Sequence, residues 1–140
     1  MSSTEDTQID TSKKRGRPPA FNYEDALEKA MQTFWTYGYE GTSMAALIEA
    51  MDMNKPSIYA AFGNKEALFN KALDKYVAGP SAFVQEAMAE PTAYQAAKKF
   101  LIKAVELLTQ QRNQRGCMIV QGALSCGPEA AMIQKKLISY

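Results

Sequence analysis

Apolar residues recur along most of this chain at intervals of three and four positions, the spacing of one helix face. The first such segment begins near Tyr23, and its repeat ends at Gly38 and Gly41. No alternating pattern typical of strands competes with it, so the sequence predicts an all-α fold. Short breaks separate the further predicted helices: 43–51, 55–62, 65–78, 81–89, 92–111, 117–125 and 128–140.

Polar residues with short side chains stand where several of these helices begin. Thr42 is the predicted N-cap of the second helix, and Asn64 is the predicted N-cap of the fourth. Thr92 opens a capping-box pattern at the start of the long helix in the second half. Pro56 is tolerated because it falls in the first turn of its helix.

Residues 42–62 combine two short helices with a three-residue break. This is the layout of a helix-turn-helix, in which the second helix enters the major groove of DNA and the first braces it. Ile58 and Phe62 mark the apolar side of the second helix. The residues that can face outward carry polar groups: Asn54, Lys55, Ser57 and Tyr59. The layout alone also fits a plain helical hairpin with a solvated face.

The chain has 140 residues, which allows one ordinary domain or two small ones, and 46% of them are apolar, enough for a core. No apolar run is long enough to span a bilayer. The first twenty residues are polar and charged, unlike a secretory signal. We therefore expect a cytoplasmic location and no membrane partner.

The net charge of +1 conceals an uneven distribution. Residues 1–12 carry three carboxylates and no base, whereas residues 13–17 carry four bases. A basic cluster on an otherwise neutral chain indicates a local anionic partner, with DNA phosphate as the leading candidate. Residues 1–20, which end in two prolines, are predicted to form a disordered basic arm.

Candidate catalytic chemistry is sparse. The chain has no histidine, so nucleophilic triads and most zinc sites lack their usual member. No spacing singles out a carboxylate pair or a Ser/Lys arrangement, and we expect neither an enzyme nor a cofactor. The two cysteines, Cys117 and Cys126, do not make a disulfide framework. Cys117 could be a thiol-based redox or soft-metal sensor, although a free cysteine is more often buried and inert.

Three segments resemble the N-terminal signature of the TetR/AcrR family of transcriptional regulators. Residues 42–48 read TSMAALI, residues 57–62 read SIYAAF and residues 64–69 read NKEALF. The preceding GYEGT turn at 38–42 also matches the family. The resemblance is close over residues 24–70 and implies a helix-turn-helix domain that binds a palindromic DNA operator as a homodimer, most often as a ligand-responsive repressor.

The resemblance implies a set of DNA-binding positions on the second and third helices of the domain and at the helix N-termini. These positions are Thr42, Ser43, Asn54, Lys55, Pro56, Ser57, Tyr59 and Lys65. Arg15 and Arg17 join them, because residues 13–18 resemble an AT-hook core that lies in a narrow minor groove. Two residues depart from the family pattern in this region. Asp52 stands where the turn usually has glycine, and Pro56 stands where a small residue is common.

The domain organisation expected from the resemblance is an arm over 1–20, a DNA-binding domain over 21–66 and a regulatory domain over 67–140. In the family the last of these dimerises and encloses an effector, here an unidentified small molecule. The candidate lining is Phe100, Ala104, Leu108, Cys117 and Met118. Family members are longer, so we expect this domain to be incomplete. A DNA-binding fragment without regulation is the alternative to a full regulator.

Overall fold

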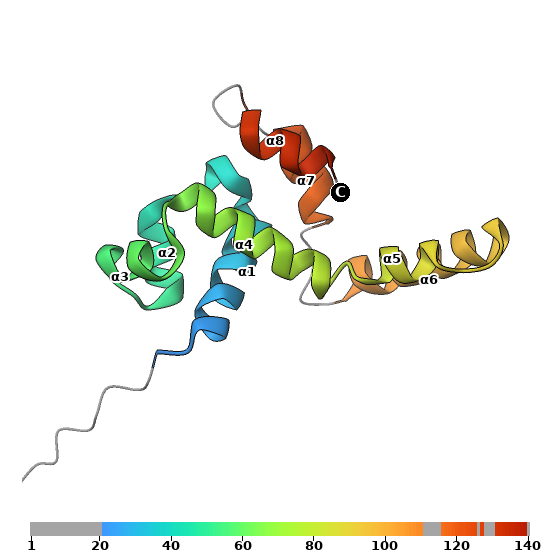
Figure 1. Cartoon of the computed structure of the whole chain (residues 1–140), viewed down its shortest axis with the longest axis horizontal. Helices are drawn as coiled ribbons and strands as arrows, with labels where there is room; N and C mark the ends of the chain where they lie inside the picture. The colour runs from blue at the N-terminus through green and yellow to red at the C-terminus, as the bar shows by residue number, and fades with distance from the viewer. Residues whose placement is uncertain (1–20, 111–115, 126, 128–130, 140) are drawn as a thin grey trace, which may run out of the picture.

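The computed structural model describes residues 21–110, 116–125, 127 and 131–139 (Figure 1). All regular secondary structure in this part of the chain is helical, which confirms the predicted fold class. The helices are α1 (Tyr23–Gly41), α2 (Met44–Met51), α3 (Lys55–Phe62), α4 (Lys65–Ala78), α5 (Phe83–Met88), α6 (Ala93–Thr109), α7 (Met118–Ser125) and α8 (Ala131–Ile138). None of the described helices has both the length and the apolar character needed to cross a membrane.

Side-chain caps set most of the helix starts. Asn64 and Thr92 each accept a hydrogen bond from the backbone N–H three residues further on, at 2.8 and 3.2 Å, which confirms both predicted caps. Asn54 does the same for α3, at 2.9 Å. These bonds satisfy N–H groups that have no partner within the helix.

The start of α2 corrects one prediction. Its N-cap is Ser43, whose hydroxyl accepts a hydrogen bond from the N–H of Ala46 at 3.1 Å. Thr42, the predicted cap, instead ends α1, and its fully buried hydroxyl donates to the carbonyl of Gly38 at 2.6 Å. The reason is that α1 does not stop at Gly38. The backbone breaks there (φ 73°, ψ 176°) and then completes one more turn to Gly41, which places Thr42 inside.

The core forms where α1 crosses α4. The rings of Phe34 and Phe69 meet edge to face at 5.0 Å, and those of Trp35 and Tyr76 do so at 4.9 Å. Leu47 from α2, with Ile58 and Phe62 from α3, completes the same cluster. Burial of these apolar surfaces is the main force that holds the four helices together.

Helices α7 and α8 pack on each other and cover one side of this core (Figure 1). Met118, Ile133 and Leu137 are almost fully buried and belong to the same apolar cluster as α1 and α4. A long-range hydrogen bond fixes the start of α7, since the indole N–H of Trp35 donates to the carbonyl of Gly116 at 2.8 Å.

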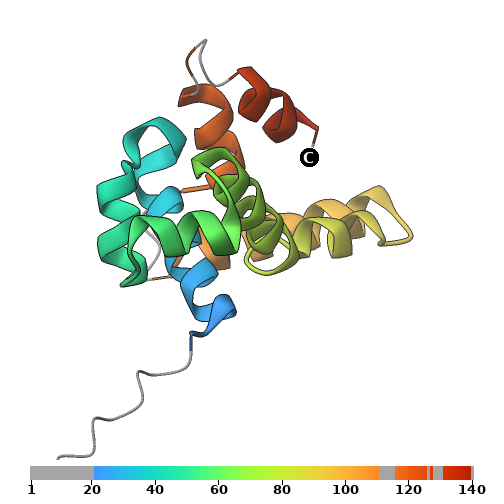
Figure 2. The ribbon, with the colours of Figure 1, turned by 60° about the vertical axis from the view of Figure 1, so that its left-hand side comes forward.

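Helices α5 and α6 form a hairpin that extends away from the rest of the molecule (Figures 1 and 2). The rings of Phe83 and Phe100 pack within it at 5.8 Å, and Lys99 pairs with Glu90 at 2.8 Å. None of the residues of α6 is buried, although its sequence has a strong apolar face.

The structure does not bring the five predicted ligand-lining residues together. Met118 is buried in the core and Cys117 is half-buried beside it. On α6, Phe100 and Leu108 are 41% and 49% exposed, and Ala104 is half-buried. The physical reason is that α6 packs mainly on α5 and touches the main core only near its end, at Leu107, so most of its apolar face is left open in the described part of the chain.

Candidate nucleic-acid interface

The connection between α2 and α3 has helix-turn-helix geometry. Asp52 adopts the left-handed conformation (φ 52°, ψ 45°), and its N–H donates to the carbonyl of Glu49 at 3.3 Å. The next N–H, from Met53, donates to Ile48 at 3.2 Å. Aspartate tolerates this conformation better than most residues other than glycine, so the sequence departure at this position leaves the turn intact.

Helix α3 is buried on one side and open on the other. Ile58 and Phe62 are almost fully buried against the core. The opposite side presents predicted DNA-binding residues to solvent, and all of them are exposed: Asn54, Lys55, Pro56, Ser57 and Tyr59. A helix exposed in this way fits the major groove of B-DNA, which is about 12 Å wide.

Two of these side chains interact. The Nζ of Lys55 lies 5.7 Å from the centre of the Tyr59 ring, within the range of a cation–π contact. The phenol of Tyr59 and the ammonium of Lys55 therefore lie together on the open side of α3, and both can donate hydrogen bonds. The side chain of Asn54 is engaged in its cap, which leaves it less free to meet a base.

The N-terminal ends of α2 and α4 supply two further candidates. Ser43 is exposed at the start of α2, and Lys65 is half-buried at the start of α4. Helix N-termini offer free N–H groups and a positive dipole end, which favours phosphate. Thr42, by contrast, is buried, so its side chain does not share this surface.

Sequence reasoning missed Tyr39 as part of this region. Its ring lies under the Nζ of Lys65 at 4.5 Å, and burial lowers the pKa of Lys65 below its usual value. A single tyrosine near the end of a helix carries no signal of such a contact, because the partner lies 26 positions away in the sequence.

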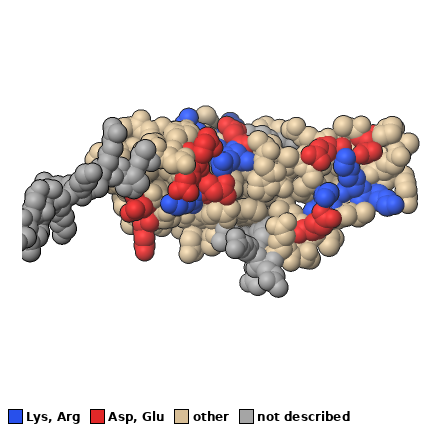
Figure 3. All heavy atoms as spheres, turned by 90° about the horizontal axis from the view of Figure 1, so that it is seen from below, with Lys and Arg blue, Asp and Glu red and all other residues tan. Residues whose placement is uncertain are grey.

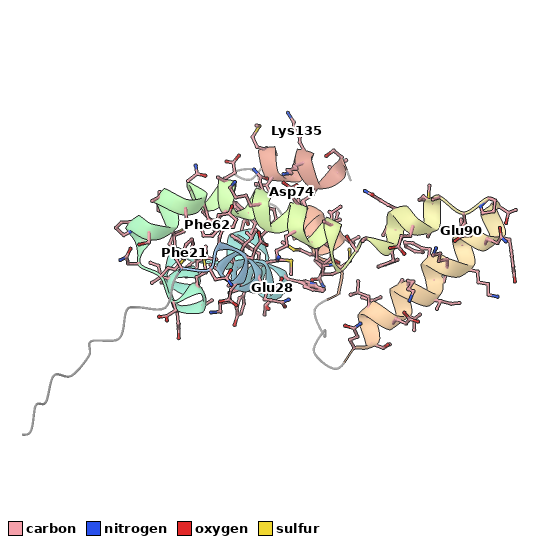
Figure 4. The ribbon with its side chains drawn as sticks, turned by 60° about the horizontal axis from the view of Figure 1, so that its bottom comes forward. Phe21, Glu28, Phe62, Asp74, Glu90 and Lys135 are labelled. Carbon is pink, nitrogen blue, oxygen red and sulfur yellow. The ribbon has the colours of Figure 1, made fainter. Side chains whose placement is uncertain are left out.

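The chain enters the domain beside α3. The ring of Phe21 lies 6.3 Å from that of Phe62, and the ring of Tyr23 stacks on Phe62 at 4.6 Å (Figure 4). The predicted arm, with Arg15 and Arg17, precedes this point and lies outside the described residues.

One other face of the molecule is mixed in charge. Acidic and basic side chains alternate over it in Figure 3. Ion pairs neutralise charges on α1 and α4, with Lys29 on Asp25 at 2.8 Å and Lys75 on Glu24 at 3.1 Å. Paired charges of both signs make a poor surface for a polyanion.

The thiol chemistry of the described chain is limited. Cys117 lies half-buried, and the phenol O–H of Tyr76 donates to its Sγ at 3.7 Å. Cys126 lies outside the described residues, among which no cluster of metal-ligating side chains occurs.

Taken together, the buried side, turn and open side of α3 define a helix-turn-helix protein. The family model of bacterial regulatory proteins, tetR family, matches residues 26–72, which run from α1 into α4. The helix-turn-helix domain of this chain, over residues 26–72, is therefore of the TetR family type.

Individual relatives agree with this assignment. The chain is 34% identical over 138 residues to the HTH-type transcriptional repressor ComR of Escherichia coli, covering 97% of this chain and 65% of ComR. It is 30% identical over 120 residues to the repressor BdcR of the same organism, covering 85% of this chain and 61% of BdcR. A cysteine mutant of the TetR family transcriptional regulator CifR, solved with 26-bp double-strand operator DNA, superposes with a TM-score of 0.79 at 40% identity. That match covers 88% of this chain and 65% of CifR. The chain thus spans just under two thirds of the length of these relatives.

Proposed function

We propose that this chain is a sequence-specific DNA-binding transcriptional regulator that acts as a repressor, and that it has no enzymatic role. The observation that carries the proposal is the exposed side of α3, braced by α2 through the left-handed turn at Asp52. The relatives ComR and BdcR are named as transcriptional repressors, and CifR was solved on operator DNA, which supports the same role here.

In this proposal α3 lies in the major groove. Lys55, Ser57 and Tyr59 meet base edges and nearby phosphates, since they share its open side. Ser43 and Lys65 meet the DNA backbone from two helix N-termini and fix the docking of α3. Asn54 and Pro56 shape the first turn of α3 and contact the DNA there. Thr42 contributes through the backbone of the α1–α2 junction, because its side chain is buried.

The basic arm adds a second contact. Phe21, the first described residue, stands next to Phe62 at the end of α3, so the point at which the arm joins the domain is close to the proposed DNA surface. Arg15 and Arg17 then lie in the adjacent minor groove, where A·T tracts strengthen the negative potential.

Regulation would come from the rest of the chain. We propose a DNA-binding domain over residues 21–66 and a regulatory domain over residues 67–140. The chain would act in the cytoplasm, as a homodimer on a palindromic operator. An unidentified small-molecule effector would change the spacing of the two recognition helices. Phe100, Ala104, Leu108, Cys117 and Met118 would surround it only when a further helix covers the open face of α6.

Selection of bound sites from random duplex DNA, at two salt concentrations, tests the proposal. The Lys55→Ala/Tyr59→Ala double variant is the matched control, because it keeps the fold and removes the reading side chains. An enriched palindrome with the wild type, lost in the control, supports a dimeric regulator. A single enriched half-site supports specific DNA binding but contradicts the dimer. No enrichment at either salt concentration contradicts sequence-specific binding.

A further inference from the structure

A cavity of about 400 Å³ opens between the second half of α1 and the start of α7. Buried Trp35 and Met118 form its floor, and exposed Tyr37, Glu40 and Gln121 stand at its rim. Its volume falls within the ~300–1,000 Å³ range of small-molecule sites. It includes no residue of α3 or α6, and it shares only Met118 with the predicted effector lining.

The chemistry of this cavity is aromatic and acidic. Four aromatic residues are among those that line it: Phe34, Trp35, Tyr37 and Tyr39. Among the described lining residues Glu40 is the only charged one, and the nearest described base that acts on it is Lys65, which lies outside the lining. An aromatic wall with one carboxylate is the arrangement that attracts organic cations, through the ring quadrupole and direct charge attraction.

Local contacts hold these groups in place. The indole N–H of Trp35 donates to Gly116 at 2.8 Å, which fixes the ring at the junction with α7. The Oε1 of Glu40 accepts a hydrogen bond from the N–H of Gly127 at 2.8 Å, which anchors the carboxylate at the rim. The ring of Tyr39 already carries the ammonium of Lys65. The ring of Phe34 packs on those of Tyr39 and Phe69. Trp35 and Tyr37 are therefore the rings that the proposal assigns to a ligand.

We propose that this cavity binds a small organic cation of the quaternary-ammonium type, with Trp35 and Tyr37 against its methyl groups and Glu40 as its counter-ion. The proposal does not rest on the proposed DNA contacts, although Tyr39 and Glu40 of the cavity both neighbour Lys65. A ligand here would touch both α1 and α7, the two elements that Trp35 joins.

The test uses choline as the probe and the intrinsic fluorescence of Trp35, the only tryptophan of the chain. Choline chloride is titrated into the full chain against sodium chloride at equal ionic strength. Its neutral carbon isostere, dimethylbutanol, is titrated in parallel. The expected result is a saturable change with choline and about tenfold weaker binding of the isostere. A change that is linear, or equal for the two compounds, overturns the proposal.

Two variants locate the binding. Glu40→Gln removes the charge and keeps the acceptor for Gly127, and it should weaken choline about tenfold. Tyr37→Leu removes a ring that is 62% exposed, so the fold should persist while choline binding weakens several-fold. The matched control is Glu49→Gln, an exposed carboxylate of α2 outside this cavity, which should leave the affinity unchanged. If Glu40→Gln and Tyr37→Leu both bind choline like the wild type, this cavity is not the site.

Discussion

The ammonium of Lys65 lies 4.5 Å from the centre of the Tyr39 ring, so the first residue of α4 rests on the last turn of α1. Tyr39 is itself braced edge to face by Phe69 at 5.1 Å. Partial burial lowers the pKa of Lys65, and the nearby carboxylate of Glu40 opposes this shift. The long side chain is therefore held in one place, which reduces the entropy lost when it meets a phosphate.

Comparing a variant of Lys65 with a variant of Tyr39 separates the effect of the lysine charge on DNA binding from the effect of its position. Lys65→Ala should weaken binding to every DNA sequence and lower the slope of log K against log salt by about 0.9, the value for one phosphate contact. Tyr39→Leu keeps the charge, so it should weaken binding without changing the slope. Binding titrations at several salt concentrations measure both. The control is Lys98→Ala, which removes an exposed lysine of α6. An unchanged slope in Lys65→Ala would show that Lys65 does not contact the DNA.

The contact between Lys55 and Tyr59 should make their effects on DNA binding non-additive. Each alanine substitution should cost about 1–3 kcal/mol of operator binding. Because the ammonium lies 5.7 Å from the ring, the double variant should cost less than the sum, by about 0.5–1 kcal/mol. A double-mutant cycle on the selected operator gives the coupling, and strict additivity would mean that the two side chains separate on DNA.

The free energy of unfolding of two variants tests whether Ser43 caps α2 and Thr42 makes a buried hydrogen bond. Thr42→Val removes the buried hydroxyl bond to Gly38 and should cost about 1–2 kcal/mol of unfolding free energy. Ser43→Ala removes the α2 cap and should cost about 1 kcal/mol, with Ser43→Thr restoring most of it. Urea unfolding followed by circular dichroism supplies the values. If Ser43→Ala is neutral, the capping assignment fails.

Tyr76 should make the protein less stable at alkaline pH. Burial, followed by its neighbour Cys117, raises the pKa of the Tyr76 phenol well above its ordinary value of 10.0. Above pH 10 the unfolded chain loses this proton while the folded chain keeps it, so the free energy of unfolding falls by up to ~1.4 kcal/mol per pH unit. The contribution is complete below pH 10 and declines above it.

The Tyr76→Phe variant isolates this proton from the lysines that titrate in the same range. Its stability should be lower than that of the wild type at pH 8, because the N–H of Met118 loses its phenol partner at 3.4 Å. The difference should shrink as the pH rises from 10 to 11. Denaturant melts at each pH measure it, with Tyr37→Phe as the exposed control. A constant difference across this range would contradict the raised pKa.

Local signals explain what the sequence could predict. Asn64 and Thr92 mark the starts of α4 and α6, because a side-chain cap depends only on neighbours within a few residues. The turn at Asp52 is equally local, since it depends on the tolerance of aspartate for the left-handed conformation.

Non-local choices explain the rest. Thr42 and Ser43 are both good caps, and only the break at Gly38 decides between them. The apolar face of α6 is visible in the sequence, but periodicity does not say which helix covers it. The contact of Tyr39 with Lys65 joins two helices, so no window of sequence contains it.

The pairing of α1 with α4 has a consequence for recombination between relatives. A crossover at residue 66 would separate Phe34 from Phe69 and Trp35 from Tyr76, leaving two mismatched aromatic surfaces. A crossover at Gly79, where α4 ends, keeps both pairs within one parent. The segment that could be transferred to another regulator as a unit is thus longer than the helix-turn-helix itself, because it must include α4.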